Sequence, residues 1–238
     1  MSSITWTPRA VASEAKPCAR RLWRAVEAQH VASTTRLVDD LGEQALLEEI
    51  LEQSKPAPPE DARGLHYLLA TPFRYPPHAR GSRFRSPADP GAFYGAREQR
   101  SACAELGYWR WRFLMECPGL TDIGPVPQTV FQVNVAAAAV DLRQKPFSRH
   151  ARRWTDPVDY GATQALARAA REGGVGLILY QSVRDPQSGE CAALLTPRGF
   201  ARPRRPVAEQ TWFLTVSRAA SAWQRNGERY EFFWAGKA

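Results

Sequence analysis

Residues 81–105 read GSRFRSPADPGAFYGAREQRSACAE, and they carry an arginine, a tyrosine and a glutamate at equal intervals. Arg83 lies eleven residues before Tyr94, and Tyr94 lies eleven residues before Glu105. The prolines and glycines before AFYGA are typical of a loop, AFYGA itself predicts a short strand, and Arg97–Met115 predicts a helix. The three side chains are therefore expected on a loop, on a strand and inside an apolar helix.

The remaining chain after residue 60 also mixes both kinds of secondary structure. Several apolar or β-branched runs predict strands, namely Leu65–Ala70, Thr129–Val135, Val175–Val183 and the terminal pair TWFLTV and ERYEFFW, with a tight turn at Asn226-Gly227. Tyr160–Glu172 predicts a helix that ends at Gly173-Gly174. The pattern indicates an α+β domain with a mixed sheet and flanking helices.

The first 60 residues have a different pattern, which predicts helices. Leu22, Trp23 and Val26 are spaced for one face of a helix, and the leucine-rich run Leu37–Leu51 predicts a second, amphipathic helix. The run KPAPPE, Lys55–Glu60, cannot continue a helix because of its prolines. We therefore expect a helical N-terminal extension over residues 1–60 and a main domain over residues 61–238.

The net charge also differs between residues 1–60 and residues 61–238. Residues 1–60 hold 7 Lys+Arg and 9 Asp+Glu, a net charge of −2, whereas residues 61–238 hold 25 and 15, a net charge of +10. A basic domain favours anionic partners such as nucleic acid, phosphorylated ligands or an acidic protein, and charge alone does not choose among them.

Other classes of protein find no support in the sequence. No run approaches the roughly 18 apolar residues of a membrane span, and the N-terminus has no apolar signal-peptide core, so we expect a cytoplasmic protein. The four cysteines form no CxxC pair and the four histidines lie far apart, so no metal site is expected. A GxGxxG motif for a recycled dinucleotide cofactor is absent.

Each candidate residue has a structural interpretation beside a functional one. Glu105 lies among apolar residues, where a carboxylate is costly unless an arginine pairs with it or a function needs it. Tyr94 suits a core position, and Arg83 a solvated loop. Arg74 and Tyr75 repeat the pairing of an arginine with an aromatic ring. Arginines match phosphates and aromatic faces match flat rings, so together these residues suit a dinucleotide.

The order TPFRY, GSRF, FYGA and AE, followed far downstream by LILYQSVR, resembles the RES domain family from about Leu69 to Leu195. The family is named for an arginine, a glutamate and a serine. The resemblance implies an ADP-ribosyltransferase-like mixed β-sheet core in a toxin of a bacterial toxin–antitoxin system. It implies a substrate, NAD, that is consumed by hydrolysis, phosphorolysis or ADP-ribosyl transfer, and so no separate cofactor.

The resemblance also assigns residues and partners. Arg83, Glu105 and Ser182 match the three residues of the family name, and Arg74, Tyr75 and Tyr94 fall where the family places further NAD contacts. It implies Glu105, Arg83 and Tyr94 as catalytic residues, and Arg74, Tyr75, Arg83, Tyr94 and Ser182 as NAD-binding residues. The implied partner is an Xre-type helix-turn-helix antitoxin in an oligomeric complex that reaches DNA only through the antitoxin. A basic nucleic-acid-binding protein and an RNA-targeting toxin remain the alternatives.

Overall fold

The computed structural model describes residues 6–28, 40–75 and 81–234, and its centre is a mixed sheet of eight strands in the order β1-β2-β5-β4-β3-β6-β7-β8. The strands are β1 (Lys16–Glu27), β2 (Phe93–Ala96), β3 (Asp122–Asp141), β4 (Leu177–Gln181), β5 (Glu190–Leu194), β6 (Ala208–Ser217), β7 (Ala220–Arg225) and β8 (Glu228–Phe233). Only β3 and β4 run parallel to each other; the other pairings are antiparallel. The predicted α+β class with a mixed sheet is confirmed.

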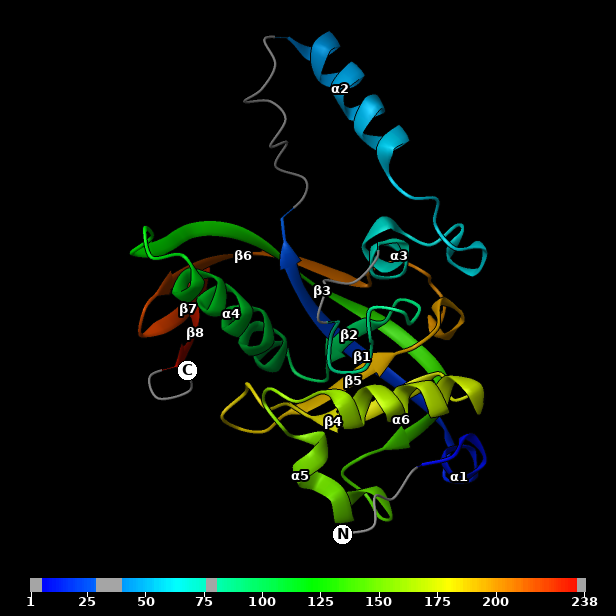
Figure 1. Ribbon diagram of the computed structural model, residues 1–238. Helices are drawn as coiled ribbons and strands as arrows, with labels where there is room; N and C mark the ends of the chain where they lie inside the picture. The colour runs from blue at the N-terminus through cyan, green and yellow to red at the C-terminus, as the bar shows by residue number, and fades with distance from the viewer. Residues whose placement is uncertain (1–5, 29–39, 76–80, 235–238) are drawn as a thin grey trace.

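Helices flank this sheet (Figure 1). The α-helices are α1 (Pro8–Ser13), α2 (Leu41–Ser54), α3 (Tyr67–Arg74), α4 (Gln99–Glu116), α5 (Ala151–Trp154) and α6 (Gly161–Glu172), and the 3-10 helices are η2 (Glu60–Ala62), η3 (Phe147–His150) and η4 (Pro197–Gly199). Within the described residues, no helix is both long and apolar enough to cross a bilayer.

Two long helices, α4 and α6, cover the same face of the sheet. Leu166 of α6 packs in one core cluster with β4 and β5, and Trp111 of α4 packs in another with β6. Trp23 of β1 contacts both clusters, which places them on one face. The opposite face is packed by α3 through Leu68 and Phe73. The strands β2, β5 and β4 therefore lie on the same sheet as the face that α4 and α6 cover.

The prediction of a helix around Leu22 is wrong, because Lys16–Glu27 is the strand β1. This strand pairs along its length with β3, and Trp23 also pairs with Ala96 of β2. Leu22 packs on one face of the sheet and Trp23 on the other. Because apolar residues pack on both faces around Leu22 and Trp23, they do not alternate with polar ones there, and their spacing imitates a helix. Part of the expected extension is thus built into the sheet.

Leu65–Ala70 is likewise not a strand, since Tyr67–Arg74 forms the helix α3. The His66 imidazole caps this helix by accepting the N–H of Leu68 at 3.3 Å. The predicted terminal pair of strands is a three-stranded meander, in which Asn226-Gly227 joins β7 to β8. Both turn residues have positive φ, 44° and 86°, as the tight turn predicted there requires.

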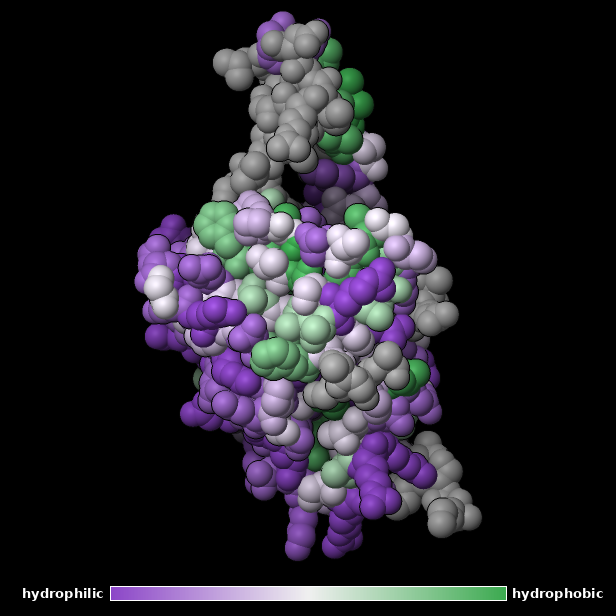
Figure 2. Space-filling view, turned by 90° about the vertical axis from the view of Figure 1, so that its left-hand side faces the viewer, coloured by the Kyte–Doolittle hydropathy of each residue, from purple (hydrophilic) through white to green (hydrophobic). Residues whose placement is uncertain are grey.

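The second predicted N-terminal helix is present as α2, although Leu37 lies outside the described residues. The Asp40 carboxylate caps it by accepting the N–H groups of Gly42 and Glu43 at 2.6 and 2.9 Å. The helix stands away from the sheet in Figure 1, and Figure 2 shows apolar side chains on this projecting part beside a mostly hydrophilic body. Leu46 and Ile50 are among its exposed side chains.

Candidate functional site

The candidate site, called the crevice from here on, is the region between α4 and the end of β4 where Glu105 and Ser182 meet. Glu105 sits in the second turn of α4, half-buried, beside the fully buried Ala104. Ser182 follows the last residue of β4 and is buried. The helix after β2 and the end of β4 thus bring together two residues that are 77 positions apart in sequence.

The Ser182 hydroxyl fixes one oxygen of Glu105. Its Oγ accepts the backbone N–H groups of Arg184 at 3.2 Å and Asp185 at 3.0 Å, so its own proton is free to be donated. It donates that proton to Glu105 Oε1 at 2.6 Å. Cys191 Sγ also lies 4.0 Å from Oε1. Within the described part of the chain, no hydrogen bond reaches Oε2, which leaves this oxygen available to a ligand.

The electrostatics of Glu105 result from opposing effects. Burial raises the pKa of the Glu105 carboxyl above its ordinary value, and this is the largest effect. The hydrogen bond from Ser182 and the positive charges of Arg184 and Arg83 oppose it by stabilising the carboxylate, whereas the charge of Asp185 raises the pKa further. The site therefore holds a desolvated carboxylate close to two cations.

Arg83 reaches the crevice from a tight turn before β2. Ser82 and Arg85 close the turn through two backbone hydrogen bonds, and Gly81 has a φ of 68°. A Cβ at Gly81 would lie 2.2 Å from the carbonyl oxygen of Arg85, so the turn requires glycine. The buried Arg83 guanidinium donates to the carbonyl of Trp154 at 2.9 Å and lies 4.7 Å from the centre of the Tyr160 ring.

Tyr94 holds this turn in place. Its hydroxyl accepts the N–H of Phe84 at 3.0 Å and lies 2.7 Å from the Oγ of Ser82. Burial is the main cause that raises the pKa of the Tyr94 phenol, so the hydroxyl keeps its proton at neutral pH. The Tyr94 hydroxyl therefore holds Ser82 and Phe84, the residues that directly precede and follow Arg83.

The buried Tyr180 of β4 interacts electrostatically with several of these residues. Burial, and then the neighbouring Cys191 and Glu105, raise the pKa of the Tyr180 phenol. Tyr94 also raises the pKa of this phenol, whereas the positive charge of Arg83 lowers it. Three of the residues singled out from the sequence, Arg83, Tyr94 and Glu105, therefore interact electrostatically with one buried tyrosine.

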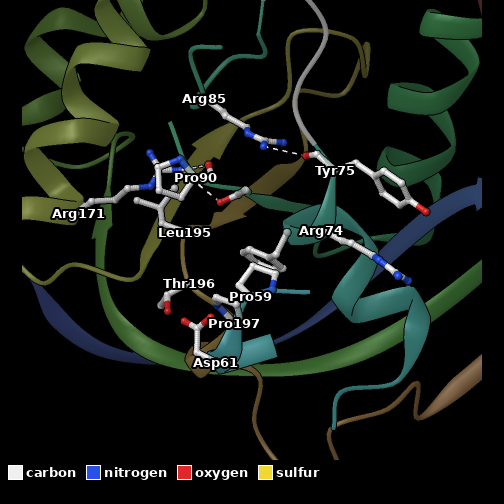
Figure 3. Close-up of a pocket in the computed structure, with 12 residues that line it drawn as sticks. Pro59, Asp61, Arg74, Tyr75, Arg85, Pro90, Arg171, Leu195, Thr196 and Pro197 are labelled. Atoms are coloured by element: carbon white, nitrogen blue, oxygen red, sulfur yellow. Dashed lines mark hydrogen bonds between the residues drawn. The ribbon is translucent and has the colours of Figure 1, made fainter. Parts of the chain in front are cut away.

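Arg74 and Tyr75 lie elsewhere. They line a cavity of about 370 Å³ together with Gly91, which precedes β2, and Leu195, which follows β5 (Figure 3). Glu105 instead neighbours the other end of β5. Arg74 Nε donates to a backbone carbonyl of the preceding loop, and the carbonyl of Tyr75 accepts from a guanidinium at 2.9 Å. The structure thus does not bring these two residues to Glu105.

Sequence reasoning missed Arg184, a buried cation of the same crevice. Its Nη2 donates to the carbonyl of Pro157 at 2.6 Å and to the Tyr160 hydroxyl at 3.3 Å. The guanidinium lies 3.7 Å from the centre of the Tyr108 ring. A signal was available, because Ser182 begins the run SVRD, in which two charged residues directly follow a buried strand.

Asp185 completes the turn that holds Ser182. Its carboxylate accepts from Ser101 Oγ at 2.6 Å, from the N–H of Gln187 at 3.0 Å and from Arg100. Burial alone would raise the pKa of Asp185, but these hydrogen bonds outweigh it and lower the pKa. Asp185 is therefore a structural carboxylate that ties α4 to the loop after β4. Among the described residues, no group of three or more His, Cys, Asp or Glu side chains could hold a metal ion.

Three comparisons place this architecture among known proteins. A search of curated proteins finds no match. A chain in the crystal structure of the M. tuberculosis MbcT–MbcA toxin–antitoxin complex has a similar fold, with a TM-score of 0.51 and 14% identity over 86% of this chain and 90% of that chain. The family model of the RES domain matches residues 58–217, more than half of the sequence, so this chain belongs to the RES domain family.

Proposed function

We propose that this chain is the toxin of a bacterial toxin–antitoxin pair and that it consumes NAD by cleaving the nicotinamide–ribose bond. Membership of the RES domain family and the fold shared with a chain of a toxin–antitoxin complex support this role. The observation that carries the chemistry is Glu105, a half-buried carboxylate with one oxygen held by Ser182 and the other available.

The chemistry needs a negative charge at this position. When the C1′–N bond of NAD breaks, both bonding electrons go to the pyridinium nitrogen, nicotinamide leaves as a neutral ring, and positive charge develops on the ribose. A carboxylate beside the ribose stabilises that charge, most effectively where water is excluded. Glu105 Oε2 supplies it, while Ser182 fixes the orientation of the carboxyl group. An acceptor with a lone pair then attacks C1′.

The pyrophosphate of NAD needs positive charge, and Arg83 and Arg184 supply it in this proposal. Each guanidinium donates to a backbone carbonyl, of Trp154 and Pro157 respectively, and a neutral carbonyl leaves the charge uncompensated. Among the described residues, no carboxylate lies within ion-pair distance of either guanidinium. Two buried cations near the catalytic carboxylate suit the two negative charges of a pyrophosphate.

The partner in this proposal is an Xre-type helix-turn-helix antitoxin. The basic domain would bind an acidic segment of the antitoxin at the crevice, and DNA would be reached only through the antitoxin. The complex would be oligomeric and cytoplasmic.

The alternative of a nucleic-acid-binding protein or RNA-targeting toxin receives no such support. It would use the basic run Arg143–Arg153, but Arg143 is neutralised by Asp141 and Glu190, each at 2.7 Å. Arg143 is one of the five Lys and Arg residues of this run, and its paired charge contributes little to phosphate binding.

The test follows the appearance of free nicotinamide after purified protein is mixed with NAD. The proposal predicts stoichiometric release of nicotinamide with loss of NAD. Running the reaction in phosphate-free buffer, with added phosphate and with a candidate protein acceptor identifies which acceptor attacks C1′. NAD that stays intact in all three reactions would refute the proposed function.

A further inference from the structure

An exposed tryptophan follows Glu105 by one turn on α4. Trp109 is 52% exposed, and Phe113, one turn further on, is 50% exposed. Residues four apart lie on the same face of a helix, so Glu105, Trp109 and Phe113 form a line that runs from the crevice outward. Scattered apolar residues are normal on surfaces, but this indole is aligned with the candidate catalytic carboxylate.

Arg184 connects Trp109 to the site. Its guanidinium lies 3.7 Å from the centre of the Tyr108 ring and 5.9 Å from that of Trp109. The two aromatic rings meet edge to face, with centres 5.5 Å apart. The same guanidinium lowers the pKa of Glu105 by its charge. Carboxylate, cation and exposed indole are therefore successive neighbours along one side of the crevice.

This order matches the order of groups in a dinucleotide. We infer that Trp109 is the stacking platform for the adenine ring of NAD, with the pyrophosphate beside Arg184 and the scissile nicotinamide ribose at Glu105. The inference rests on the proposed function. The nicotinamide end must lie at Glu105, because the bond to be broken is there. The adenine is the opposite end of the molecule, and an exposed indole face can receive a flat ring.

The size of the effect follows from stacking of a base on an aromatic side chain. When the stacked aromatic side chain is replaced by alanine, the affinity for the nucleotide falls by roughly 5- to 150-fold. Nicotinamide mononucleotide lacks the adenine, so its affinity is expected to be independent of Trp109. The ratio of the two affinities isolates the adenine contact from any general disturbance of the crevice.

The experiment measures dissociation constants for NAD and for nicotinamide mononucleotide by calorimetry, in a Glu105→Gln background that slows turnover. We expect Trp109→Ala to weaken NAD about 5- to 150-fold and to change nicotinamide mononucleotide less than about twofold, with Trp109→Phe restoring most of the NAD affinity. The matched control is Phe213→Ala. Phe213 is also 50% exposed, but it lies between Trp212 and Leu214, which face α4, and so belongs to the opposite face of the sheet.

Three results would overturn the inference. NAD affinity could stay within about twofold of the parent, the two ligands could weaken equally, or Phe213→Ala could weaken NAD as much as Trp109→Ala. Loss of antitoxin binding with unchanged NAD affinity would likewise assign Trp109 to a protein interface. Failure of the proposed function is separate, because it is seen as absence of nicotinamide release from NAD by the unmodified protein.

Discussion

Replacing Ser182 with alanine removes a hydroxyl that makes three hydrogen bonds. The backbone N–H groups of Arg184 and Asp185 lose their acceptor, and Glu105 Oε1 loses its donor. A buried polar group left unsatisfied costs about 1–3 kcal/mol. The two N–H groups together should lower the free energy of unfolding by about 2–6 kcal/mol, which corresponds to a decrease in melting temperature of about 4–24 °C for a chain of this size.

The same change should alter the pH dependence of catalysis. The bond from Ser182 lowers the pKa of Glu105, so its loss should raise that pKa further. A hydrogen bond to a charged group is worth about 1.5–3 kcal/mol, and one pKa unit corresponds to about 1.36 kcal/mol. The acid limb of the pH profile of kcat should therefore move up by about one to two pH units, because catalysis requires the ionised carboxylate.

The assay is nicotinamide release at saturating NAD between pH 5 and 9, with melting temperature as a parallel measurement. Ser101→Ala is the matched control. Ser101 is buried in the same hydrogen-bond network and donates to Asp185 at 2.6 Å, but not to Glu105. The control should lower the melting temperature and leave the acid limb in place. If Ser182→Ala is destabilised and its acid limb stays at the parental pH, Ser182 does not act on Glu105 and the reasoning is refuted.

Three further predictions concern charge, two of them at the candidate site and one over the whole of residues 61–238. Arg83→Ala should weaken NAD binding as well as turnover, because it removes a phosphate-binding cation, and calorimetry showing parental affinity would contradict this. Glu105→Gln should melt at a higher temperature than the parent at pH 7.5. The pKa of Glu105 is higher in the folded state than in the unfolded state, so the ionised carboxylate destabilises the fold increasingly as pH rises between those two values. The gain in melting temperature of Glu105→Gln over the parent should therefore vanish at a pH below about 4, where the carboxyl group is protonated in both states. An unchanged or lower melting temperature at pH 7.5 would instead indicate a stabilising ion pair. Association with the antitoxin should slow steeply with added salt in stopped-flow measurements, because residues 61–238 carry a net charge of +10, and a salt-independent rate would exclude electrostatic steering.

Two of the helices were predicted nearly to their ends. Arg97–Met115 and Tyr160–Glu172 match α4 and α6 to within about two residues at each end. For α6 the reason is a clear apolar stripe that ends at Gly173-Gly174, whereas α4 has apolar residues around its whole circumference. The strand β1 was missed because apolar residues pack on both of its faces around Leu22 and Trp23, and because its pairing with β3 is a long-range contact that no local pattern encodes. The helix α3 was missed because a short apolar run suits a strand as well.

In the candidate site, too, some residues could be identified from the sequence and others could not. Glu105 is visible in the sequence as a carboxylate within an apolar helix, whereas the roles of Arg83 and Ser182 were implied by the resemblance to the RES domain family, and the structure brings Ser182 to Glu105. The separation of Arg74 from Glu105 could not be predicted, because it depends on which end of β5 each element packs against. Arg184 was overlooked because the run SVRD is a weak signal in a chain with 32 Lys and Arg residues, and the burial of this arginine is known only from the structure.

The most direct test of the central claim compares NAD cleavage by the parent protein and by Glu105→Gln, with NAD affinity measured on both. Glutamine keeps the size of the side chain and can still accept from Ser182, so only the negative charge is lost. Stabilisation by one strong electrostatic group is worth roughly 10²–10³ in rate, and it acts mainly in the transition state. We predict that turnover falls by about two to three orders of magnitude while NAD affinity changes by less than about fivefold. Nicotinamide release by Glu105→Gln at a near-parental rate would contradict the assignment of Glu105 as the catalytic carboxylate.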